Sequence, residues 1–516
     1  MNKAIYILFI GVLITLSSCR KDFDTSPSSG GLEFSKDKVY LDTVFTNIGS
    51  STYTLKVYNR SNKDINIPTI QLAKADSKYR IMVDGMTGED ADHNGIGDGK
   101  IFRNVELLAK DSLFIFIETT VNVTETEPNF TYNDKILFDS GSNEQHVDLI
   151  TLIQDANFIY PNRPLDTGIK ETLTIAHLEG VEGHTLTDAE LHWTNSKSYV
   201  IYGYAAVPSG KNLVIDPGTR VYFHSESGLI IDDGATLTVN GTANIIGADG
   251  TITTRNEVNF EGDRLEPDFE DVPGQWGTVL MFSGGSNLIT HLTLKNATVG
   301  LLVQRNVPET LPNLQIDNSQ IYNSSNVGIL ARAAKITGTN LVISTAGQQC
   351  LACQQGGQYD FTHCSFNNNW NNTNQFAVLL DNYQVDDNNV SSPLLLQAAF
   401  KNSIIYGSNN IELYFDKKGP DNLWNVSIDH CLIKFREAGT SVDGNPLYTS
   451  IRGGANGNNI IDDPMFYEPN QNKLNIQDGP AVGAGNTTYI IPFDILGVSR
   501  TSPPDLGAYQ HAPFPL

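Results

Sequence analysis

The sequence predicts an all-β protein with an antiparallel β-sandwich near its N-terminal end and a parallel β-solenoid after it. Short runs of alternating apolar and polar residues, separated by turn residues, fill 32–156 and indicate antiparallel strands. A six-residue pattern recurs down the C-terminal half, which is typical of stacked coils. Only five cysteines occur in 516 residues, so the fold must rest on packing and backbone pairing rather than on disulfides.

The first eighteen residues have the pattern of an export signal. One early lysine, Lys3, precedes an apolar stretch, 4–16, that is too short to span a bilayer as a helix. The sequence Leu-Ser-Ser-Cys follows at 16–19 and resembles the bacterial lipobox, whose cysteine accepts diacylglycerol. The resemblance implies a signal peptide, 1–18, and a lipoprotein that is anchored to a membrane through Cys19.

The segment 19–31 is expected to be a flexible tether, because its serine, proline and glycine residues bury too little apolar surface to fold. Its acidic start, with Lys21, Asp22 and Asp24, resembles the export signals of Bacteroidetes surface lipoproteins. We therefore expect a cell-envelope protein that is lipid-anchored to the outer membrane. The sequence is compatible with a position on either side of that membrane. The formal net charge of −24 repels phosphate backbones and argues against nucleic acid as a partner.

The segment 32–156 is predicted to fold as a β-sandwich. Runs such as 53–58 and 113–117 alternate in polarity over the length of a strand. The stretches 41–49 and 55–59 resemble the immunoglobulin-like modules of bacterial surface proteins, including the group named after abnormal spindle and hydin. The resemblance implies a spacer or docking module that ends where proline and glycine residues interrupt the alternation.

One loop of this segment has the composition of a calcium site. Asp90, Asp92, Asn94 and Asp98 place oxygen side chains at alternate positions, and Gly95 allows a sharp turn. The spacing resembles thrombospondin type 3 repeats and the first half of an EF-hand loop, but an isoleucine stands where the EF-hand has its bidentate glutamate. We therefore expect structural Ca²⁺ binding, with a plain polar hairpin loop as the alternative.

The segment 165–516 is predicted to be one solenoid. The recurring pattern is an apolar residue, two residues, a small residue, one residue and a second apolar residue, at spacings near the length of one β-helix coil. Stacked coils would place the small residues in one column. The copies are 294–299, 316–321, 336–341, 361–366, 400–405 and 428–433, with Ala297, Ser319, Thr339, Cys364, Ser403 and Cys431 as the small residues.

The cysteines of the solenoid are expected to be structural. Cys364 and Cys431 would lie two coils apart, beyond the separation that a disulfide allows. Cys350 and Cys353 lie in a predicted strand and are expected to point to opposite faces, which argues against a zinc or redox site.

The C-terminal end carries an ordered set of short motifs. They are Asp-Asp-Pro-Met-Phe at 462–466, a proline- and glycine-rich stretch at 479–486, Asp-Ile-Leu-Gly-Val-Ser-Arg at 494–500 and Asp-Leu-Gly-Ala-Tyr-Gln at 505–510. Together they resemble the closing segment of bacterial right-handed parallel β-helix proteins, often written DPxF, SPAxxAG, DxxGxxR and DIGAYE. The resemblance implies the pectin-lyase-like superfold, which hosts lyases, hydrolases and adhesins and so implies no particular activity.

Aligning four neighbouring strands of the solenoid on their apolar pairs predicts an outward-facing groove. One outward column mixes charged and aromatic side chains that suit hydrogen bonding and stacking against a sugar. Its members are Arg332, Cys353, Asp381 and Tyr414, with Glu412 and Asp416 beside them. A β-helix lyase needs a basic residue near a cation, and a hydrolase needs clustered carboxylates. Neither set is complete in the sequence, so no catalytic residue is assigned.

A second candidate is the loop 263–271, which concentrates five carboxylates around Arg264. The loop could bind a cation or a glycan; the alternative is a solvated insertion whose Phe269 caps a coil. His363 and His430 precede the column cysteines at matching positions, and we expect them to be surface residues of the ladder rather than catalytic groups.

Two classes of function follow. Because the ionisable residues are scattered, the sequence favours a non-enzymatic envelope lipoprotein whose β-helix binds a glycan, a matrix component or another envelope protein. The alternative is a polysaccharide lyase or glycoside hydrolase that uses the face carrying Arg332, Asp381, Glu412 and Tyr414.

Overall fold

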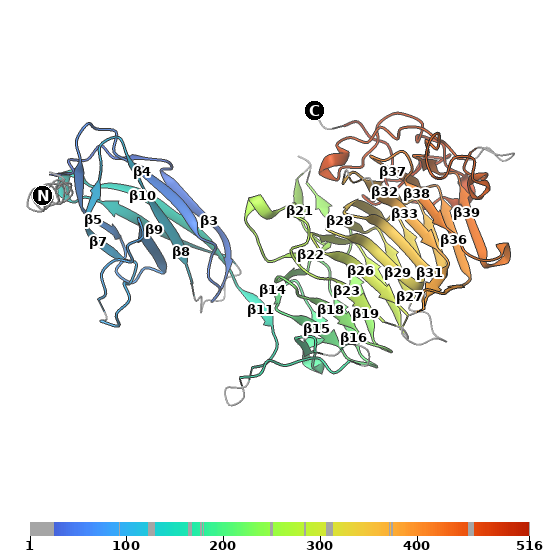
Figure 1. Cartoon of the computed structure of the whole chain (residues 1–516), viewed down its shortest axis with the longest axis horizontal. Helices are drawn as coiled ribbons and strands as arrows, with labels where there is room; N and C mark the ends of the chain where they lie inside the picture. Colours follow the sequence, from blue (N-terminus) through green and yellow to red (C-terminus); the bar gives the residue numbers. More distant parts are fainter. Residues whose placement is uncertain are drawn as a thin grey trace, which may run out of the picture. The chain divides into compact units, whose positions relative to one another are not determined.

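The computed structural model describes residues 25–514 except 92, 122–128, 164–167, 176–177, 179, 248–250, 283–284, 306–312, 371, 373–374, 387 and 453–458. The described chain is nearly all β and divides into two compact units, Met1–Asp155 and Ala156–Leu516 (Figure 1). Cys19 and the predicted signal peptide lie outside the described residues. Within those residues no helix is long and apolar enough to cross a membrane.

The N-terminal unit consists of two sheets around one core. One sheet has the order β1-β5-β9-β10-β3, with β7 beside β5, and the other has the order β2-β4-β8-β6. Buried side chains of both sheets, such as Leu41 and Ile115, belong to a single cluster. The strands are β1 Ser26–Pro27, β2 Glu33–Phe34, β3 Lys38–Phe45, β4 Tyr53–Tyr58, β5 Ile65–Leu72, β6 Tyr79–Val83, β7 Ile101–Leu107, β8 Ser112–Thr119, β9 Asn129–Phe138 and β10 Gln145–Gln154.

The second half of the predicted tether belongs to this unit. Ser26 and Pro27 pair in parallel with β5. The buried Ser28 hydroxyl donates to the Asp139 carboxylate at 2.8 Å. A flexible tether as far as residue 31 is therefore wrong from Ser26 onward, because backbone pairing orders a segment whose composition alone indicates disorder.

Residues Ala156–Leu516 form a parallel β-helix-like solenoid (Figure 1). Each complete coil adds one strand to each of three faces, named A, B and C in the order in which the chain visits them, and successive coils pair in parallel. The all-β class and the parallel solenoid predicted for this part of the chain are confirmed.

Face A is the ten-stranded sheet. It consists of β11 Ala156–Ile159, β14 Ser198–Ile201, β17 Arg220–Phe223, β22 Val258–Gly262, β25 Leu292–Lys295, β28 Gln320–Ser324, β30 Val342–Ala346, β32 Ser365–Asn368, β37 Ile404–Gly407 and β40 Leu432–Ile433.

Faces B and C share two long strands, β29 Val327–Thr339 and β31 Gln349–Thr362, which pass around the corner between them. The other strands of face B are β12 Gly183–Thr185, β15 Tyr204–Val207, β18 Gly228–Ile231, β23 Val279–Met281, β26 Val299–Gln304, β33 Phe376–Asp381 and β38 Leu413–Asp416. The other strands of face C are β13 His192–Trp193, β16 Asn212–Ile215, β19 Thr236–Asn240, β24 Ser286–Thr290, β27 Asn313–Asp317, β36 Leu396–Lys401 and β39 Trp424–Asp429.

Stacked apolar side chains fill the interior of the solenoid. On face A, residues that pair from strand to strand form one fully buried inward column, and burial of each such side chain contributes roughly 1.5–3 kcal/mol. The column consists of Val221, Phe260, Leu294, Ile321, Ile343, Phe366, Ile405 and Ile433.

The corner between faces C and A has a left-handed backbone in six coils. Its φ lies between 47° and 54°, a region that asparagine and histidine enter more readily than most residues. In four coils the next residue donates its hydroxyl or thiol to the carbonyl two positions before it, at 2.8–3.5 Å, so a small polar side chain fits there. The corner residues are His291, Asn318, Asn340, His363, Asn402 and His430, and the donors are Ser319, Cys364, Ser403 and Cys431.

The predicted copy 294–299 is wrong in register. Leu294 pairs with Ile321 in the inward column of face A, so the copy starts one strand too late. Ala297 therefore lies outside the corner column and instead bridges Trp276 at the next corner of the coil.

The predicted copy 336–341 is shifted by two residues. Thr339 pairs with Asp317, and Leu341 is the residue beside Ser319. Side chains of a strand alternate with a period of two, so a shift of two residues keeps the apolar residues on the inner side. The pattern of apolar residues therefore cannot distinguish the two registers.

Two expectations about buried groups are also wrong. Cys350 and Cys353 both belong to the inner core, since strict alternation is lost where β31 begins at the corner between faces A and B. His363 is fully buried rather than a surface residue, and this burial lowers its pKa to about 3. The four described cysteines are free, as expected.

The C-terminal segment folds back over the outer side of face A. Leu474, Ile495 and Tyr509 cluster with Val342, and Leu506 belongs to a second cluster with residues of the last coils. The closing motifs thus bury apolar side chains on the last coils of the solenoid.

The same segment is fastened to the corner column. The Asn402 amide exchanges two hydrogen bonds with the backbone of Asn486, at 2.8 and 3.0 Å. The buried Arg500 guanidinium donates to Asn340 Oδ1 at 2.8 Å and to the carbonyls of Gly507 and Ala508. The closing motif that ends in Arg500 therefore has a structural role.

We expect Arg500→Ala to lower the free energy of unfolding of the C-terminal unit by about 2–4 kcal/mol, because three buried acceptors lose a charged donor. Thermal unfolding and limited proteolysis of 459–512 measure the effect. Arg436→Ala, which removes an exposed arginine of the same unit, is the control and should change stability by less than about 0.5 kcal/mol. Equal stability of the two variants would contradict the proposed fastening.

Candidate functional site

A polar groove lies on the outer side of face A over its middle coils. Its floor is formed by β22, β25 and β28, and its volume is about 800 Å³. The insertion that follows β22 forms one wall, and residues 471–473 of the C-terminal segment line the other end. The groove therefore combines the second sequence candidate, 263–271, with residues at least two hundred positions further along the chain.

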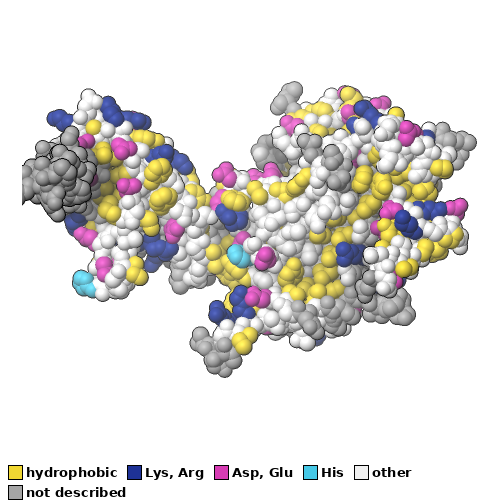
Figure 2. Space-filling view, viewed as in Figure 1, with side chains coloured by type: hydrophobic (Ala, Val, Ile, Leu, Met, Phe, Trp, Pro, Cys, Tyr) yellow, Lys and Arg dark blue, Asp and Glu magenta, His cyan; other side chains and the backbone are white. Residues whose placement is uncertain are grey.

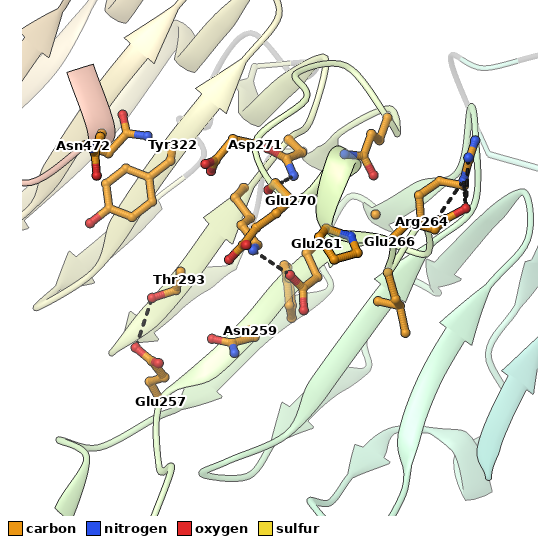
Figure 3. Close-up of a pocket in the computed structure, with 18 of the residues that line it drawn as sticks. Glu257, Asn259, Glu261, Arg264, Glu266, Glu270, Asp271, Thr293, Tyr322 and Asn472 are labelled. Carbon is orange, nitrogen blue, oxygen red and sulfur yellow. Dashed lines mark hydrogen bonds and ion pairs between the residues drawn. The ribbon is translucent and has the colours of Figure 1, made fainter. Parts of the chain in front are cut away.

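Paired charges cover the floor of the groove (Figure 3). Lys295 lies 3.0 Å from Glu261 on the neighbouring strand. Thr293 donates its hydroxyl to Glu257 at 3.1 Å, and Arg255 lies 3.5 Å from the same carboxylate. Strand pairing thus places Glu261 on β22, and Glu257 just before this strand, beside the basic and hydroxyl side chains of β25.

The wall is held by its own ion pair and by contacts with the floor. Arg264 bonds Glu266 through two nitrogens at 2.9–3.1 Å and stacks over Phe269 at 3.7 Å. Asn296 donates to the Glu270 carbonyl at 2.8 Å. Phe269 therefore supports the arginine of the wall and is only half-buried, so it does not cap a coil as the alternative reading of the loop supposed.

Three acceptor atoms of the groove have no hydrogen-bond partner among the described residues. They are Oδ1 of Asn259, Oδ1 of Asn296 and Oε1 of Gln275. Asn259 and Asn296 are only 9% and 2% exposed. Buried polar atoms are nearly always satisfied in folded proteins, so these oxygens indicate a place where another molecule supplies the donors.

A second cavity of about 780 Å³ lies further along the outer side of face A. Its lining includes Tyr406 and Lys434, whose ammonium donates to the Tyr406 hydroxyl at 2.9 Å, and the fully buried Asn367. Burial raises the pKa of Tyr406 to about 12. Asn472, which lines the first cavity, accepts a hydrogen bond from the Thr345 hydroxyl at 2.8 Å.

The predicted column on face B is only partly correct. The observed register places Gln304, Arg332, Gln354, Asp381 and Asp416 in one outward column. Arg332, Asp381 and Asp416 are therefore brought together as predicted. Figure 2 shows that acidic and basic side chains are interspersed on the face in view, with no large patch of one sign there.

The remaining members of the predicted column lie elsewhere. Cys353 points inward and pairs with Ala331. Tyr414 is two residues out of register and stacks on Phe376 at 4.7 Å. Glu412 is fully buried and accepts backbone N–H groups from both sides, so it is not part of any groove.

The carboxyl groups of Asp381 and Glu412 differ in environment. Burial raises the pKa of Asp381 to about 6, and the neighbouring Asp416 adds to the rise, whereas the backbone N–H of Gln355 and the Arg332 charge oppose it. Burial raises the pKa of Glu412 to about 8 against two backbone hydrogen bonds of 2.7 Å. Asp381 on the surface column therefore keeps its proton to a higher pH than an exposed aspartate does, and Glu412 in the core keeps its proton to a higher pH still.

The predicted calcium loop is described except for Asp92. Asp90 accepts the backbone N–H groups of Asn94 and Gly95 at 3.1 and 2.8 Å, and Asp98 accepts that of Ala91 at 2.9 Å. These bonds give the loop its turns. Among the described residues, which leave out Asp92, no group of three His, Cys, Asp or Glu side chains could hold a metal ion. Calcium binding therefore stays a prediction.

The floor of the groove was not among the sites predicted from the sequence. Glu257, Asn259 and Glu261 alternate along one strand and therefore project from the same side. That alternation was the available signal, but on its own it also fits an ordinary solvated face.

Comparison with known proteins gives no family for the chain. No family model matches the sequence, and no curated protein matches it. The catalytic unit of a thermostable GH87 alpha-1,3-glucanase from Streptomyces thermodiastaticus covers 73% of this chain and 74% of its own, at 11% identity and a TM-score of 0.23.

Two further solved structures match only a quarter of the chain. A family 123 glycoside hydrolase from Clostridium perfringens covers 27% of this chain and 29% of its own, at 8% identity and a TM-score of 0.18. A PapD-like domain of human CEP192 covers 25% of this chain and 89% of its own, at 12% identity and a TM-score of 0.16. Likenesses of this weakness carry no argument about activity.

The buried carboxyl groups predict a pH dependence of stability. The folded-state pKa of Glu412 lies above its value in the unfolded chain, so stability should fall as the pH rises from about 4.5 to about 8. Glu412→Gln should remove the contribution of this group to the pH dependence of the free energy of unfolding, which is up to about 1.4 kcal/mol per pH unit. At low pH the same substitution should cost about 1–3 kcal/mol of stability, because an amide oxygen can accept only one of the two N–H groups.

Urea unfolding at several pH values measures both effects. Glu226→Gln replaces an exposed glutamate and should leave the slope as it is in the unchanged protein. A Glu412→Gln variant with the full slope would show that this carboxyl group is ionised in the folded protein.

Proposed function

We propose that the C-terminal unit binds a glycan, without converting it, in the groove over face A. The observation that carries the proposal is the presence of buried, unpartnered amide oxygens at Asn259 and Asn296 in a cavity large enough for several sugar rings. The half-buried Tyr322 ring at the end of the groove adds a surface on which a sugar ring can stack.

The proposed setting is the cell envelope. The lipobox-like sequence ending in Cys19 supports a lipid anchor on the outer membrane, and the acidic residues after it support display on the cell surface. We further propose that the N-terminal unit is an immunoglobulin-like module that acts as a spacer or docking unit, and that the solenoid is right-handed.

A second candidate function rests on the column of face B. Asp381 and Asp416 are register partners on adjacent parallel strands, which lie about 4.8 Å apart. Paired carboxyl groups with different proton affinities can act as acid and base in glycoside hydrolysis, and the raised pKa of Asp381 suits an acid. Arg332 and Tyr383, which donates to Asp416 at 2.7 Å, complete this alternative.

The purified chain from Arg20 to Leu516, applied to a glycan array, should bind saccharides and release no unsaturated or reducing-end products. Asn259→Ala should weaken binding about tenfold, the value of one buried hydrogen bond, because the ligand loses an acceptor. Asn212→Ala is the control, since it removes an exposed asparagine from face C. Isothermal titration with the best array hit measures both variants.

The same preparation distinguishes the second candidate. Product release that is abolished by Asp381→Asn, with binding unaffected by Asn259→Ala, would replace the binding function by hydrolysis on face B. Absence of binding to any glycan would contradict the first proposal and favour a protein partner.

Calcium binding at Asp90, Asp92, Asn94 and Asp98 is proposed as a structural feature of the N-terminal unit. Calcium at a hundredfold excess over its dissociation constant should stabilise this unit by about 2.7 kcal/mol, and a chelator should reverse the effect. Calorimetry with Ca²⁺, Mg²⁺ and EGTA measures the shift. Asp90→Asn should abolish it, and an unchanged unfolding temperature at millimolar Ca²⁺ would leave the loop as a polar hairpin.

A further inference from the structure

The groove over face A contains buried hydrogen-bond acceptors that have no donor. The three unpartnered atoms, Asn259 Oδ1, Asn296 Oδ1 and Gln275 Oε1, are all acceptors. Among the described side chains that line the groove, no fully buried donor lacks a partner, and the more exposed amide nitrogen of Asn259 is bonded to none of the described residues. A ligand that satisfies the buried oxygens must therefore bring hydrogen-bond donors.

The orientation of two of these amides is fixed by their other end. The Asn296 nitrogen donates to the Glu270 carbonyl at 2.8 Å. The Gln275 nitrogen donates to the carbonyls of Phe269 and Val272 at 2.5 and 2.9 Å. Turning either amide around would place its oxygen against a carbonyl oxygen, so the two unpartnered atoms are oxygens and can only accept hydrogen bonds.

The cationic side chains of the groove are already paired. Lys295 lies 3.0 Å from Glu261, Arg255 lies 3.5 Å from Glu257, and the other two pairs, Arg264 with Glu266 and Lys473 with Glu468, are 2.9 and 2.5 Å apart. The pair of Lys295 and Glu261 is the most shielded, since both side chains are less than a quarter exposed. An anionic ligand would have to break such a pair to gain a cation.

The charge balance of the lining also opposes anions. Five carboxylates and four cationic side chains line the groove, which leaves an excess of one negative charge. A carboxylate or sulfate group placed there meets like charge in a partly desolvated site, whereas a hydroxyl group meets acceptors that need it.

Resting on the proposed glycan-binding function, we propose that this groove takes a neutral, hydroxyl-rich saccharide and rejects uronic acids and sulfated sugars. The ligand's hydroxyl groups donate to Asn259 on the floor and to Asn296 and Gln275 beside it, and a ring stacks on Tyr322. In Figure 3, Asn259 lies between Glu257 and Glu261, so a sugar bonded to its oxygen lies among carboxylates.

The test compares matched ligands on the chain from Arg20 to Leu516. Oligogalacturonides, the same oligomers after reduction of their carboxyl groups, neutral glucan oligosaccharides and chitosan oligosaccharides are titrated with and without salt. We expect binding of neutral oligosaccharides only, with an affinity that changes less than about twofold between about 0.05 and 0.5 M NaCl.

Glu261→Gln provides an independent readout. It removes the partner of Lys295, so the variant should gain at least tenfold affinity for oligogalacturonides relative to the unchanged chain. Glu89→Gln, which frees an arginine in the N-terminal unit instead, is the matched control and should gain nothing.

The outcomes separate this inference from the function on which it rests. Salt-sensitive binding of oligogalacturonides or of chitosan by the unchanged chain would overturn the neutral-sugar inference and leave glycan binding in place. Binding of no saccharide at all would overturn both.

Discussion

The left-handed corner between faces C and A is the constraint on which the β-helix depends. In six coils one residue has a positive φ there, and in four of these coils the following side chain bonds the carbonyl two positions earlier. This geometry limits the corner to residues that tolerate the conformation, mainly asparagine and histidine. The C-terminal segment is fastened to the same column at Asn340 and Asn402, so the register of the stack and the closure of the unit have a common origin.

The position of the groove follows from this arrangement. With the register held at the corner, the outward residues of β22, β25 and β28 stand in straight columns on face A. The C-terminal segment buries the outer side of the last coils through Val342 and Ile404, and the insertion after β22 closes one side of the earlier ones. What remains open between them is the polar part of face A, where Glu261, Lys295 and Asn259 project.

The sequence predicted the all-β class and the parallel stacking of the C-terminal unit, because these depend on periodicity and on repeated local motifs. It could not determine the register, since Thr339 and Leu341 differ by one period of a strand and both choices keep the apolar residues inside. A separate shift of two residues, in the alignment of β38 with β33, placed Tyr414 in a column to which it does not belong. Glu412 was misplaced for another reason: a buried carboxyl group bonded to two N–H groups looks in sequence like any surface glutamate.

The site itself depends on contacts that no local pattern reports. Asn472 reaches the floor of the groove by donating to Asn323, 149 positions earlier in the chain, and Thr345 donates to its oxygen. The loop 263–271 was singled out for its carboxylates, yet its Arg264 and Glu266 satisfy each other and the acceptors without a partner are neutral amides. In a chain with a net charge of −24, most acidic side chains serve to keep the protein soluble. A buried amide oxygen without a donor, in contrast, costs stability unless a ligand supplies the donor. The uncharged side chains are therefore the more specific indicators of a binding site in this protein.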